Sequence, residues 1–330
     1  MKYFVWEISM DTNKFKQYYN IAKSIQNEVR KVVLGKDEVI EKILATSLAG
    51  GHVLLDDIPG VGKTTLALAF SYATSMDYHR LQFTPDVLPT DVTGFSIYDK
   101  RTDSFQYKEG VAMCNLFLAD EINRTSSKTQ SALLELMEEG SVTVDGNKHE
   151  LPNPFVVIAT QNPIGSVGTQ MLPDSQLDRF MVCLTMGYPS ITDEVLILKG
   201  RQETNPLSEV KSVATKEDII AMRELVKNVY TDDKIYEYIA AISDATRNNE
   251  MLKLGLSPRG SLAIARVARA IAFLHGRNYV IPDDISDIFL DVATHRIVLS
   301  PKAKISDITT EQLLTEILES VPVPTLNIGK

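Results

Sequence analysis

The residues best suited to chemistry form a glycine-bearing turn between an apolar run and a helical pattern. The apolar run covers residues 52–55, and the turn has the sequence DIPGVGKTT. Glycines at two turn positions let backbone N–H groups curl around phosphate oxygens, and the start of the next helix adds partial positive charge. The pattern predicts a phosphate-binding loop for a nucleotide. Its members are Pro59, Gly60, Val61, Gly62, Lys63, Thr64 and Thr65.

Two side chains of this loop have specific expected roles. Lys63 is expected to reach the β- and γ-phosphates, and the Thr64 hydroxyl suits Mg²⁺. The motif normally begins with glycine, and Asp57 stands at that position. The Gly-Val-Gly-Lys-Thr segment that contacts phosphate is intact, so the departure does not remove the prediction.

A second apolar run, residues 115–119, ends in two adjacent carboxylates, Asp120 and Glu121. In open α/β sheets, ligands bind at the carboxyl ends of the strands. Asp120 suits the Mg²⁺ shell, and Glu121 suits polarising a water molecule for attack on the γ-phosphate. Adjacent acids are also common as solvated residues, but beside a phosphate loop the pair favours ATP hydrolysis.

Asn162 follows a third apolar run, residues 155–159, within the sequence Thr-Gln-Asn-Pro. It can orient the attacking water between Glu121 and the γ-phosphate, or shape the turn before Pro163. Arg179 precedes a further run, residues 180–184. It can serve as an arginine finger, a side chain that reaches the nucleotide of a neighbouring subunit, or it can form an ordinary surface ion pair.

Arg259 opens a helical pattern immediately after Ser257 and Pro258, a favourable N-cap and first helical residue. A cation at a helix N-terminus opposes the helix dipole unless an anion compensates. Contact with the γ-phosphate, and a solvated arginine that tolerates the small penalty, are both open at this point.

The elements that must position these residues form two units. Apolar runs at 52–55, 79–83, 115–119, 155–159 and 180–184 alternate with helical patterns, which predicts a parallel five-stranded sheet flanked by helices. Helices are expected at 13–31 and 36–49, and then at 192–203, 215–229, 232–248, 258–275 and 282–295. We expect an N-terminal extension (1–14), an α/β nucleotide-binding core (15–190) and an all-α lid domain (191–330).

Two β-hairpins are expected as insertions in the core, at residues 95–107 and 142–151. The second contains an Asp-Gly turn and His149, which we interpret as a hairpin surface residue. The first carries aromatic residues at 95, 98, 105 and 107. Packing of these rings on the core is the common use of such residues, and exposure toward a partner is the alternative.

Bulk composition restricts the class of protein. The net charge of −9 argues against a broad grip on nucleic acid. Cys114 and Cys183 lack metal-like spacing and are expected to be buried free thiols. No apolar stretch approaches the length of a membrane span, and a reducing cytoplasm is the expected location.

Three segments carry a resemblance to a known family: 120–139 (DEINRTSSKTQSALLELMEE), 158–180 (IATQNPIGSVGTQMLPDSQLDRF) and 254–263 (LGLSPRGSLA). They resemble the MoxR family of AAA+ ATPases, over about residues 30–300. The resemblance implies a P-loop NTPase fold of the AAA+ type and ATP and Mg²⁺ as ligands. It assigns Lys63 and Thr64 to the phosphate loop, and Asp120 and Glu121 to the metal and water-activating pair. Asn162 becomes the first sensor, Arg179 the finger and Arg259 the second sensor.

The same resemblance implies that Val33 and Gly35 border the adenine. It also implies a homo-oligomer, expected to be a hexameric ring, which remodels a protein client beside a partner with a von Willebrand factor A domain. The hairpins are similar to insertions that project toward the pore or the substrate. Whether Arg124 also acts in trans is open. An AAA+ protein acting on nucleic acid and a nucleotide-dependent scaffold without turnover are the alternatives, and a small-molecule kinase is disfavoured.

Overall fold

The computed structural model describes residues 12–162, 172–200 and 206–325. Its centre is a five-stranded sheet of order β2-β5-β8-β1-β9. Every pairing in this sheet is parallel, so the carboxyl ends of all five strands share one edge. The predicted sheet is confirmed, because each predicted apolar run corresponds to one strand. The strands are β1 (Val53–Asp56), β2 (Tyr78–Gln82), β5 (Leu116–Asp120), β8 (Val156–Gln161) and β9 (Val182–Leu184).

Helices cover both faces of the sheet, which explains why its strands are almost continuously apolar. Alternate residues of one strand point to opposite faces. Leu55 lies in the hydrophobic cluster shared with α1 (Thr12–Arg30), α2 (Asp37–Leu48) and α3 (Lys63–Thr74). Its neighbour Leu54 lies in the cluster shared with α5 (Ser127–Glu139) on the other face. The sheet is thus rigidly enclosed, and its carboxyl edge is a fixed platform for a site.

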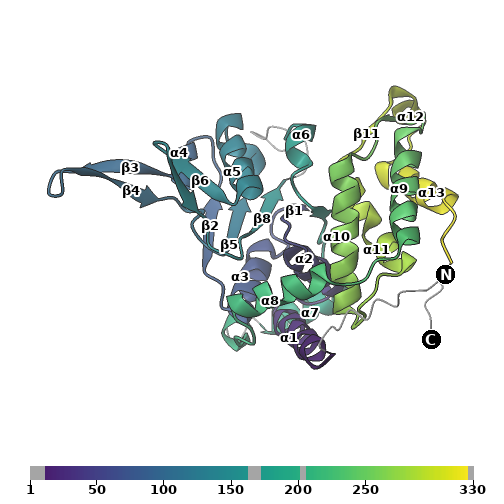
Figure 1. Ribbon diagram of the computed structural model, residues 1–330, viewed down its shortest axis with the longest axis horizontal. Coiled ribbons are helices and arrows are strands. Elements are labelled where there is room, and N and C mark those ends of the chain that lie inside the picture. The colour runs from purple at the N-terminus through teal and green to yellow at the C-terminus, as the bar shows by residue number, and fades with distance from the viewer. Residues whose placement is uncertain (1–11, 163–171, 201–205, 326–330) are drawn as a thin grey trace, which may run out of the picture.

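Two antiparallel hairpins extend from the core, as predicted (Figure 1). The first, β3 (Gly94–Asp99) and β4 (Ser104–Glu109), follows α4 (Pro89–Thr93), and the second pairs β6 (Ser141–Val144) with β7 (Asn147–Glu150). The expectation that their aromatic rings pack on the core is wrong for most of them, since Phe105 is 74% exposed, and Phe95 and Tyr98 are exposed too. Tyr107 alone turns inward, stacking on His149 of the second hairpin.

The C-terminal unit is helical, as predicted, with one small addition. A short antiparallel pair, β10 (Leu252–Leu254) and β11 (Val298–Leu299), was not expected, because neither run is long enough to show a strand pattern. The helical elements are α7 (Ile191–Gly200), η2 (Pro206–Glu209), α8 (Lys216–Lys227), α9 (Asp233–Arg247), α10 (Pro258–Leu274), α11 (Pro282–Ala293), α12 (Pro301–Ile305) and α13 (Thr310–Ser320). Two short elements of the core, η1 (Ile122–Arg124) and α6 (Asp174–Leu177), complete the described chain.

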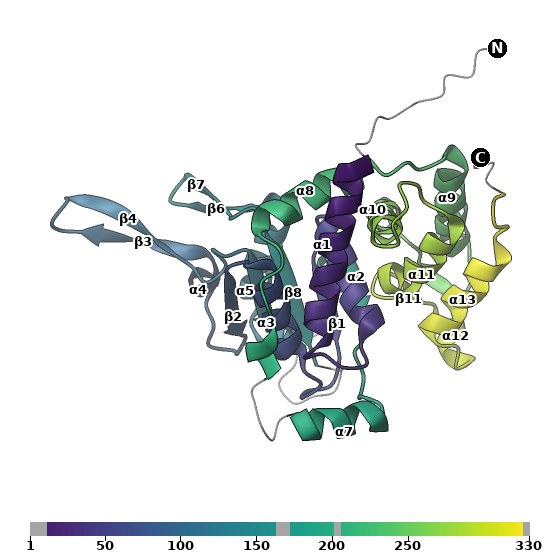
Figure 2. The same cartoon turned by 90° about the horizontal axis from the view of Figure 1, so that it is seen from below.

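The helical unit packs closely on the core. Helix α10 contacts α2, α11 contacts β9, and α8 contacts both α1 and α2. Figure 2 shows α8 beside α1. Buried residues of these helices join those of α1, α2 and α3 in one hydrophobic cluster. A salt bridge between Lys42 and Asp291 (2.6 Å) adds a polar link. The division of the chain at residues 190 and 191 stays a prediction.

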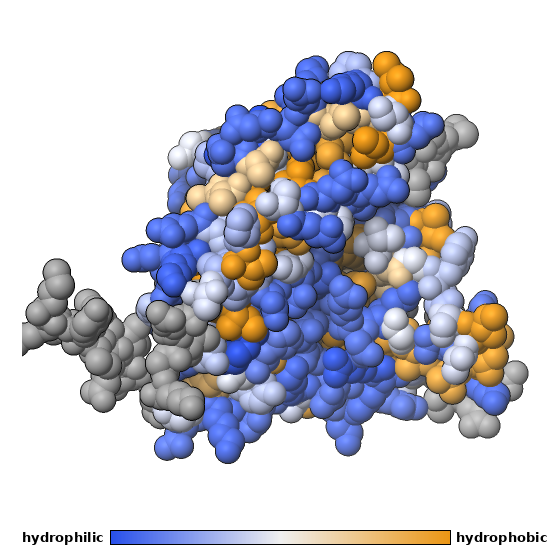
Figure 3. All heavy atoms as spheres, turned by 90° about the vertical axis from the view of Figure 1, so that its right-hand side faces the viewer, coloured by the Kyte–Doolittle hydropathy of each residue, from blue (hydrophilic) through white to orange (hydrophobic). Residues whose placement is uncertain are grey.

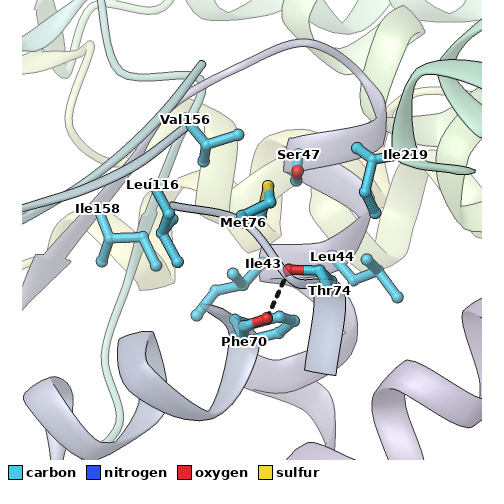
Figure 4. Close-up of a pocket in the computed structure, with 10 residues that line it drawn as sticks. All are labelled: Ile43, Leu44, Ser47, Phe70, Thr74, Met76, Leu116, Val156, Ile158 and Ile219. Carbon is cyan, nitrogen blue, oxygen red and sulfur yellow. Dashed lines mark hydrogen bonds between the residues drawn. The ribbon is translucent and has the colours of Figure 1, made fainter. Parts of the chain in front are cut away.

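A small cavity lies among α2, α3 and the sheet (Figure 4). Its walls are mainly apolar, and the Thr74 hydroxyl points to the Phe70 carbonyl oxygen at 2.6 Å. The Ser47 hydroxyl, also on the wall, has no hydrogen-bond partner among the described residues. The space amounts to about 10 Å³, which is the size of one water molecule. It therefore has no room for a nucleotide.

The face that Figure 3 shows is mainly hydrophilic, with apolar side chains in small groups. In the described part of the chain, none of the helices combines the length and apolar character needed to cross a membrane. The thiols of Cys114 and Cys183 are not paired, and burial raises the pKa of each to about 12. Both thiols therefore stay protonated at neutral pH. Cys114 is buried as predicted, whereas Cys183 is only partly buried.

Candidate nucleotide site

The predicted phosphate loop lies at the carboxyl end of β1 and leads directly into α3. Gly60 (φ 86°) and Gly62 (φ 98°) adopt the left-handed conformation that glycine tolerates. Gly62 is the residue before the first turn of α3. No atom lies within 4 Å of the position that a Cβ would take on either glycine. The loop is therefore open on the side where phosphate oxygens must approach backbone N–H groups and the helix N-terminus.

Lys63, the first residue of α3, is buried within this loop. Its Nζ donates to the carbonyl oxygen of Asp57 at 2.6 Å and approaches that of Gln161 at 3.5 Å. Burial lowers the pKa of Lys63, while the charges of four carboxylates oppose the shift. They belong to Asp57, Asp120, Asp56 and Glu121. The ammonium thus sits between the loop and the predicted acidic pair.

The contacts of Asp57 explain why this position does not hold the glycine with which the motif normally begins. Its side chain is buried, and Oδ2 accepts hydrogen bonds from the backbone N–H groups of Met186 (2.6 Å) and Gly187 (2.7 Å). Its Oδ1 accepts from the Ile58 N–H at 2.8 Å. The carboxylate therefore fastens the start of the loop to the chain that leaves β9. A glycine at this position has no side chain to make these bonds.

The end of β5 carries Asp120, whose two oxygens have different partners. Oδ1 accepts from the Thr160 hydroxyl at 2.6 Å, across the pairing of β5 with β8. Oδ2 forms a salt bridge with Arg80 of β2, also at 2.6 Å. Thr160 fixes the direction of the carboxylate, and the half-exposed Arg80 side chain neutralises it from the solvent side.

Glu121 is held in a strained but well-supported position. Its φ of 58° lies in the left-handed region, and its N–H is close to the Thr160 hydroxyl oxygen at 2.9 Å. Oε1 accepts from the Asn162 side-chain amide at 3.0 Å. Oε2 accepts from Arg124 at 2.9 Å. The predicted water-activating acid and the predicted first sensor are therefore in direct contact.

Asn162 is positioned by a second asparagine that the sequence analysis did not identify. The buried Asn123 donates to the Asn162 carbonyl oxygen at 3.1 Å, and its own side-chain oxygen receives the Asn162 N–H at 3.4 Å. A role for Asn162 in shaping the turn alone would explain neither of these bonds, nor its contact with Glu121.

The residues present fit a magnesium nucleotide. The open turn offers backbone N–H groups and Lys63 to phosphate, and Thr64 and Asp120 offer the oxygen ligands that Mg²⁺ prefers. Among the described residues, no group of three or more His, Cys, Asp and Glu side chains forms a self-sufficient metal site.

The segment expected to border the adenine packs against the beginning of the helical unit. Val33 is buried, and Gly35 has a φ of 67°. A side chain on Gly35 would collide with the carboxylate of Asp193 on α7. Lys36 also donates to the Tyr188 carbonyl oxygen at 2.9 Å. The beginning of the helical unit thus closes over this segment, and its contact with adenine stays a prediction.

The two remaining predicted residues, Arg179 and Arg259, lie together but away from this site. Arg179 forms a salt bridge with Glu138 at 3.3 Å, and Arg259 pairs with the other oxygen of the same carboxylate. Arg179 stands just before the amino end of β9, where the Met181 N–H donates to the His52 carbonyl oxygen. Because β9 runs parallel to β1, this is the opposite edge of the sheet from the phosphate loop.

Arg259 shares Glu138 with Arg179 at the amino edge of the sheet, so in this structure it is neither free in solvent nor paired with the phosphate loop of its own subunit. Its contact with a γ-phosphate stays a prediction. The anion that compensates the cation at the N-terminus of α10 is Glu138 in this structure. Within the described residues, no hydrogen bond or ion pair links either arginine to the residues of the nucleotide edge.

Several members of the site escaped the sequence analysis for a common reason. Thr160, Asn123, Arg80 and Glu138 each act through a partner that is distant in sequence, and no spacing within the sequence links the two. Thr160 alone had a usable signal, because pairing of the strands at 115–119 and 155–159 puts it beside Asp120. Arg124 pairs with Glu121 of its own subunit, and its action in trans stays open.

Comparison with known proteins supports the same assignment of fold. Residues 52–182 match the model of the ATPase family associated with various cellular activities (AAA), and residues 244–317 match an AAA lid domain. A crystal structure of a protein from Cytophaga hutchinsonii superposes with a TM-score of 0.88 at 36% identity, covering 95% of this chain and 98% of the other.

Curated relatives extend over most of the chain. A Bacillus subtilis protein, YeaC, is 49% identical over 92% of this chain and 95% of its own length. Chaperone MoxR1 of Mycobacterium tuberculosis is 38% identical over 91% of this chain and 81% of its own length. Protein MoxR of Methylorubrum extorquens is 28% identical, with coverage of 92% and 95%.

Proposed function

The chain belongs to the MoxR family of AAA+ ATPases, and on that premise we propose that it hydrolyses Mg-ATP to remodel a protein client. The observation that carries the proposal is the pairing of Glu121 with Asn162 at 3.0 Å, on the sheet edge that also bears the phosphate loop. A base oriented by an amide, beside a loop suited to phosphates, is what attack by water on a γ-phosphate requires.

Each residue at the nucleotide edge has a defined task in this proposal. Backbone N–H groups of the loop and Lys63 bind the phosphates. Glu121 takes the proton of the attacking water, and Asn162 keeps the carboxylate and the water aligned. Bound Mg²⁺, held through Thr64 and Asp120, would neutralise charge on the phosphate oxygens. The products are ADP and inorganic phosphate.

Arg80 and Arg124 balance charge at the nucleotide edge. They pair with the carboxylates of Asp120 and Glu121. Without such partners, the adjacent acids would repel each other. We propose that Arg80 leaves Asp120 when the magnesium nucleotide binds, since the cation would replace the guanidinium as the positive partner of the carboxylate. Its side chain is about two-fifths exposed, so it can move into solvent.

We propose that the arginine pair acts on the nucleotide of a neighbouring subunit. The proposal is supported by the position of Arg179 and Arg259 at the amino edge, remote from their own loop. A molecule with a nucleotide on one edge and arginines on the other is suited to head-to-tail association. Closed into a ring, expected to be a hexamer, this gives every nucleotide an arginine finger, worth about 10³–10⁵ in rate in other phosphoryl-transfer enzymes.

The client and any partner with a von Willebrand factor A domain belong to the proposal as well. The relative named Chaperone MoxR1 supports work on proteins. The projecting hairpin β3–β4, with exposed Phe105, Phe95 and Tyr98, offers an apolar surface for a client. The net charge of −9 remains an argument against nucleic acid.

Replacement of Glu121 by glutamine tests the proposal. Glu121→Gln keeps the contact with Asn162 but cannot accept a proton, so phosphate release should fall by at least about 10²-fold. Binding of a fluorescent ATP analogue should persist. Glu135→Gln, an exposed glutamate of α5, is the matched control and should behave as wild type. Wild-type turnover in Glu121→Gln would reject the role of Glu121 as the base. A wild type that binds ATP without releasing phosphate would leave only the nucleotide-dependent scaffold.

A further inference from the structure

A buried arginine, to which the proposed function gives no role, lies in the turn after α11. Arg296 is 5% exposed, and its guanidinium contacts the segment that carries Arg179. Nε donates to Asp178 Oδ1 at 2.7 Å, and Nη2 donates to the carbonyl oxygens of Asp178 (3.2 Å) and Phe180 (2.6 Å). Nη1 donates to the Met181 carbonyl oxygen at 3.1 Å. One side chain of the helical unit therefore binds the backbone on both sides of Arg179.

Neighbouring residues reinforce this contact. His295 is close to the Phe180 carbonyl oxygen, with Nε2 at 3.0 Å. Burial lowers the pKa of His295 to about 3, so the ring is neutral at pH 7 and Nε2 can donate. The aspartate that Arg296 binds also accepts from the Ser257 hydroxyl, at 3.3 and 3.2 Å.

The same arginine reaches the start of α10, which carries Arg259. Ser257 caps this helix by accepting from the Gly260 N–H. A side chain on Gly260 would come within 3.1 Å of Cδ of Arg296 and closer still to Leu256. The glycine thus leaves room for the stem of Arg296 one residue after Arg259. Arg296 lies between the two segments whose arginines share Glu138.

We propose that Arg296 is a positioning residue for Arg179, which ties the finger to the helical unit of its own subunit. The inference rests on the proposed function of Arg179 in trans. It follows that movement of the lid of one subunit displaces the finger that serves its neighbour. Because misplacement by about 1 Å can lower a rate 10²-fold, this link can couple nucleotide sites around a ring.

Arg296→Lys is the informative change, because lysine keeps the charge but lacks the fork of donors. Arg296 donates to five acceptors, the Asp178 carboxylate and the carbonyl oxygens of residues 178, 180, 181 and 292. An ammonium has three N–H donors and cannot serve all of them. We expect turnover at saturating ATP to fall at least about tenfold, with KM and the affinity for a fluorescent ATP analogue within about twofold of wild type.

A double-mutant cycle distinguishes positioning from general stability. If Arg296 acts through Arg179, Arg296→Lys combined with Arg179→Ala should be no slower than Arg179→Ala alone. The inference would be overturned if the losses of the two single variants multiplied in the double variant. It would also be overturned if Arg296→Lys kept wild-type turnover while Arg179→Ala was slow. A fast Arg179→Ala enzyme would instead reject the finger, and the inference with it.

Arg277→Lys is the matched control. Arg277 is another arginine of the helical unit, and its bonds to Tyr279, Asp284 and His275 stay within that unit. Its lysine variant should retain turnover within about twofold. Should Arg296→Lys fail to fold, Asp178→Asn takes its place, since asparagine keeps the size but removes the charge that Arg296 pairs with. The double variant Asp178→Asn with Arg179→Ala should again be no slower than Arg179→Ala alone.

Discussion

Glu121 shows how single residues are prepared for chemistry at the nucleotide edge. Its left-handed φ of 58° is uncommon for a residue with a side chain, and such conformations are of order 1–3 kcal/mol less favourable. Bonds from Asn162 to one carboxylate oxygen and from Arg124 to the other support it. The carboxylate therefore has a fixed direction before any nucleotide arrives, which favours catalysis by preorganisation.

Asp57 provides a prediction at the same scale. Asp57→Gly creates the glycine that phosphate loops commonly have at this position, yet it should destabilise this protein. It leaves the N–H groups of Met186 and Gly187 without their acceptor. We expect a loss on the order of 2–3 kcal/mol in the free energy of unfolding by urea. Asp57→Asn, which keeps one acceptor oxygen, should lose less, and a glycine variant as stable as wild type would refute the fastening role.

Residues within motifs could be predicted from the sequence, and their partners could not. Lys63, Asp120, Glu121 and Asn162 follow apolar runs at the ends of parallel strands, so their proximity followed from the sheet. Glu138 lies 41 positions before Arg179, and the sequence gives no sign that α5 brings them together. The pairing of Arg259 with Glu138 could not be predicted for the same reason, because packing of the helical unit on the core decides it.

At the scale of elements, His52 connects helix α5 and strand β8, which both flank β1. Its Nε2 lies 3.0 Å from the Met137 carbonyl oxygen in α5, and its Nδ1 accepts the Val157 N–H at 3.0 Å. Only the neutral ring, with the proton on Nε2, satisfies both contacts. Burial accordingly lowers the pKa of His52 to about 4.

This pairing predicts a loss of stability in mild acid. A histidine with pKa 6.5 when unfolded and about 4 when folded contributes fully above pH 6.5 and loses its contribution as pH falls toward 4. At pH 5 the loss is on the order of 2 kcal/mol. The raised pKa of His275 acts in the opposite sense and titrates above this window.

Urea unfolding at pH 7 and pH 5 measures the effect. His52→Gln removes the titrating ring but keeps one donor and one acceptor, so its stability should change less between the two pH values than that of wild type. Equal pH dependence in the two proteins would contradict the assignment. Any acid response from the buried His295 is present in both proteins and cancels in the comparison.

Long, periodic elements were predictable, and the environment of their side chains was less so. The strands and the main helices show strong apolar patterns, and the hairpins have polar turns. The aromatic residues of β3 and β4 fit equally well on a core or on a projecting ribbon, because alternation reports strand geometry and not what faces the strand. The pair β10–β11 is too short for any pattern.

The whole molecule has two chemically different edges. Its carboxyl edge holds the phosphate loop with Asp120, Glu121 and Asn162, and its amino edge holds Arg179 and Arg259 with Glu138. Neither edge alone contains a complete set for γ-phosphate transfer. We therefore expect the carboxyl edge of one copy to meet the amino edge of the next.

Mixing two inactive variants tests this requirement most directly. Lys63→Ala lacks nucleotide binding and Arg179→Ala lacks the finger, so each alone should release phosphate at least about 10²-fold more slowly than wild type. In an equimolar mixture that exchanges subunits, about a quarter of the interfaces combine an intact loop with an intact finger. Phosphate release should therefore recover to a substantial fraction of the wild-type rate. A mixture that assembles but stays as slow as its components would contradict the account.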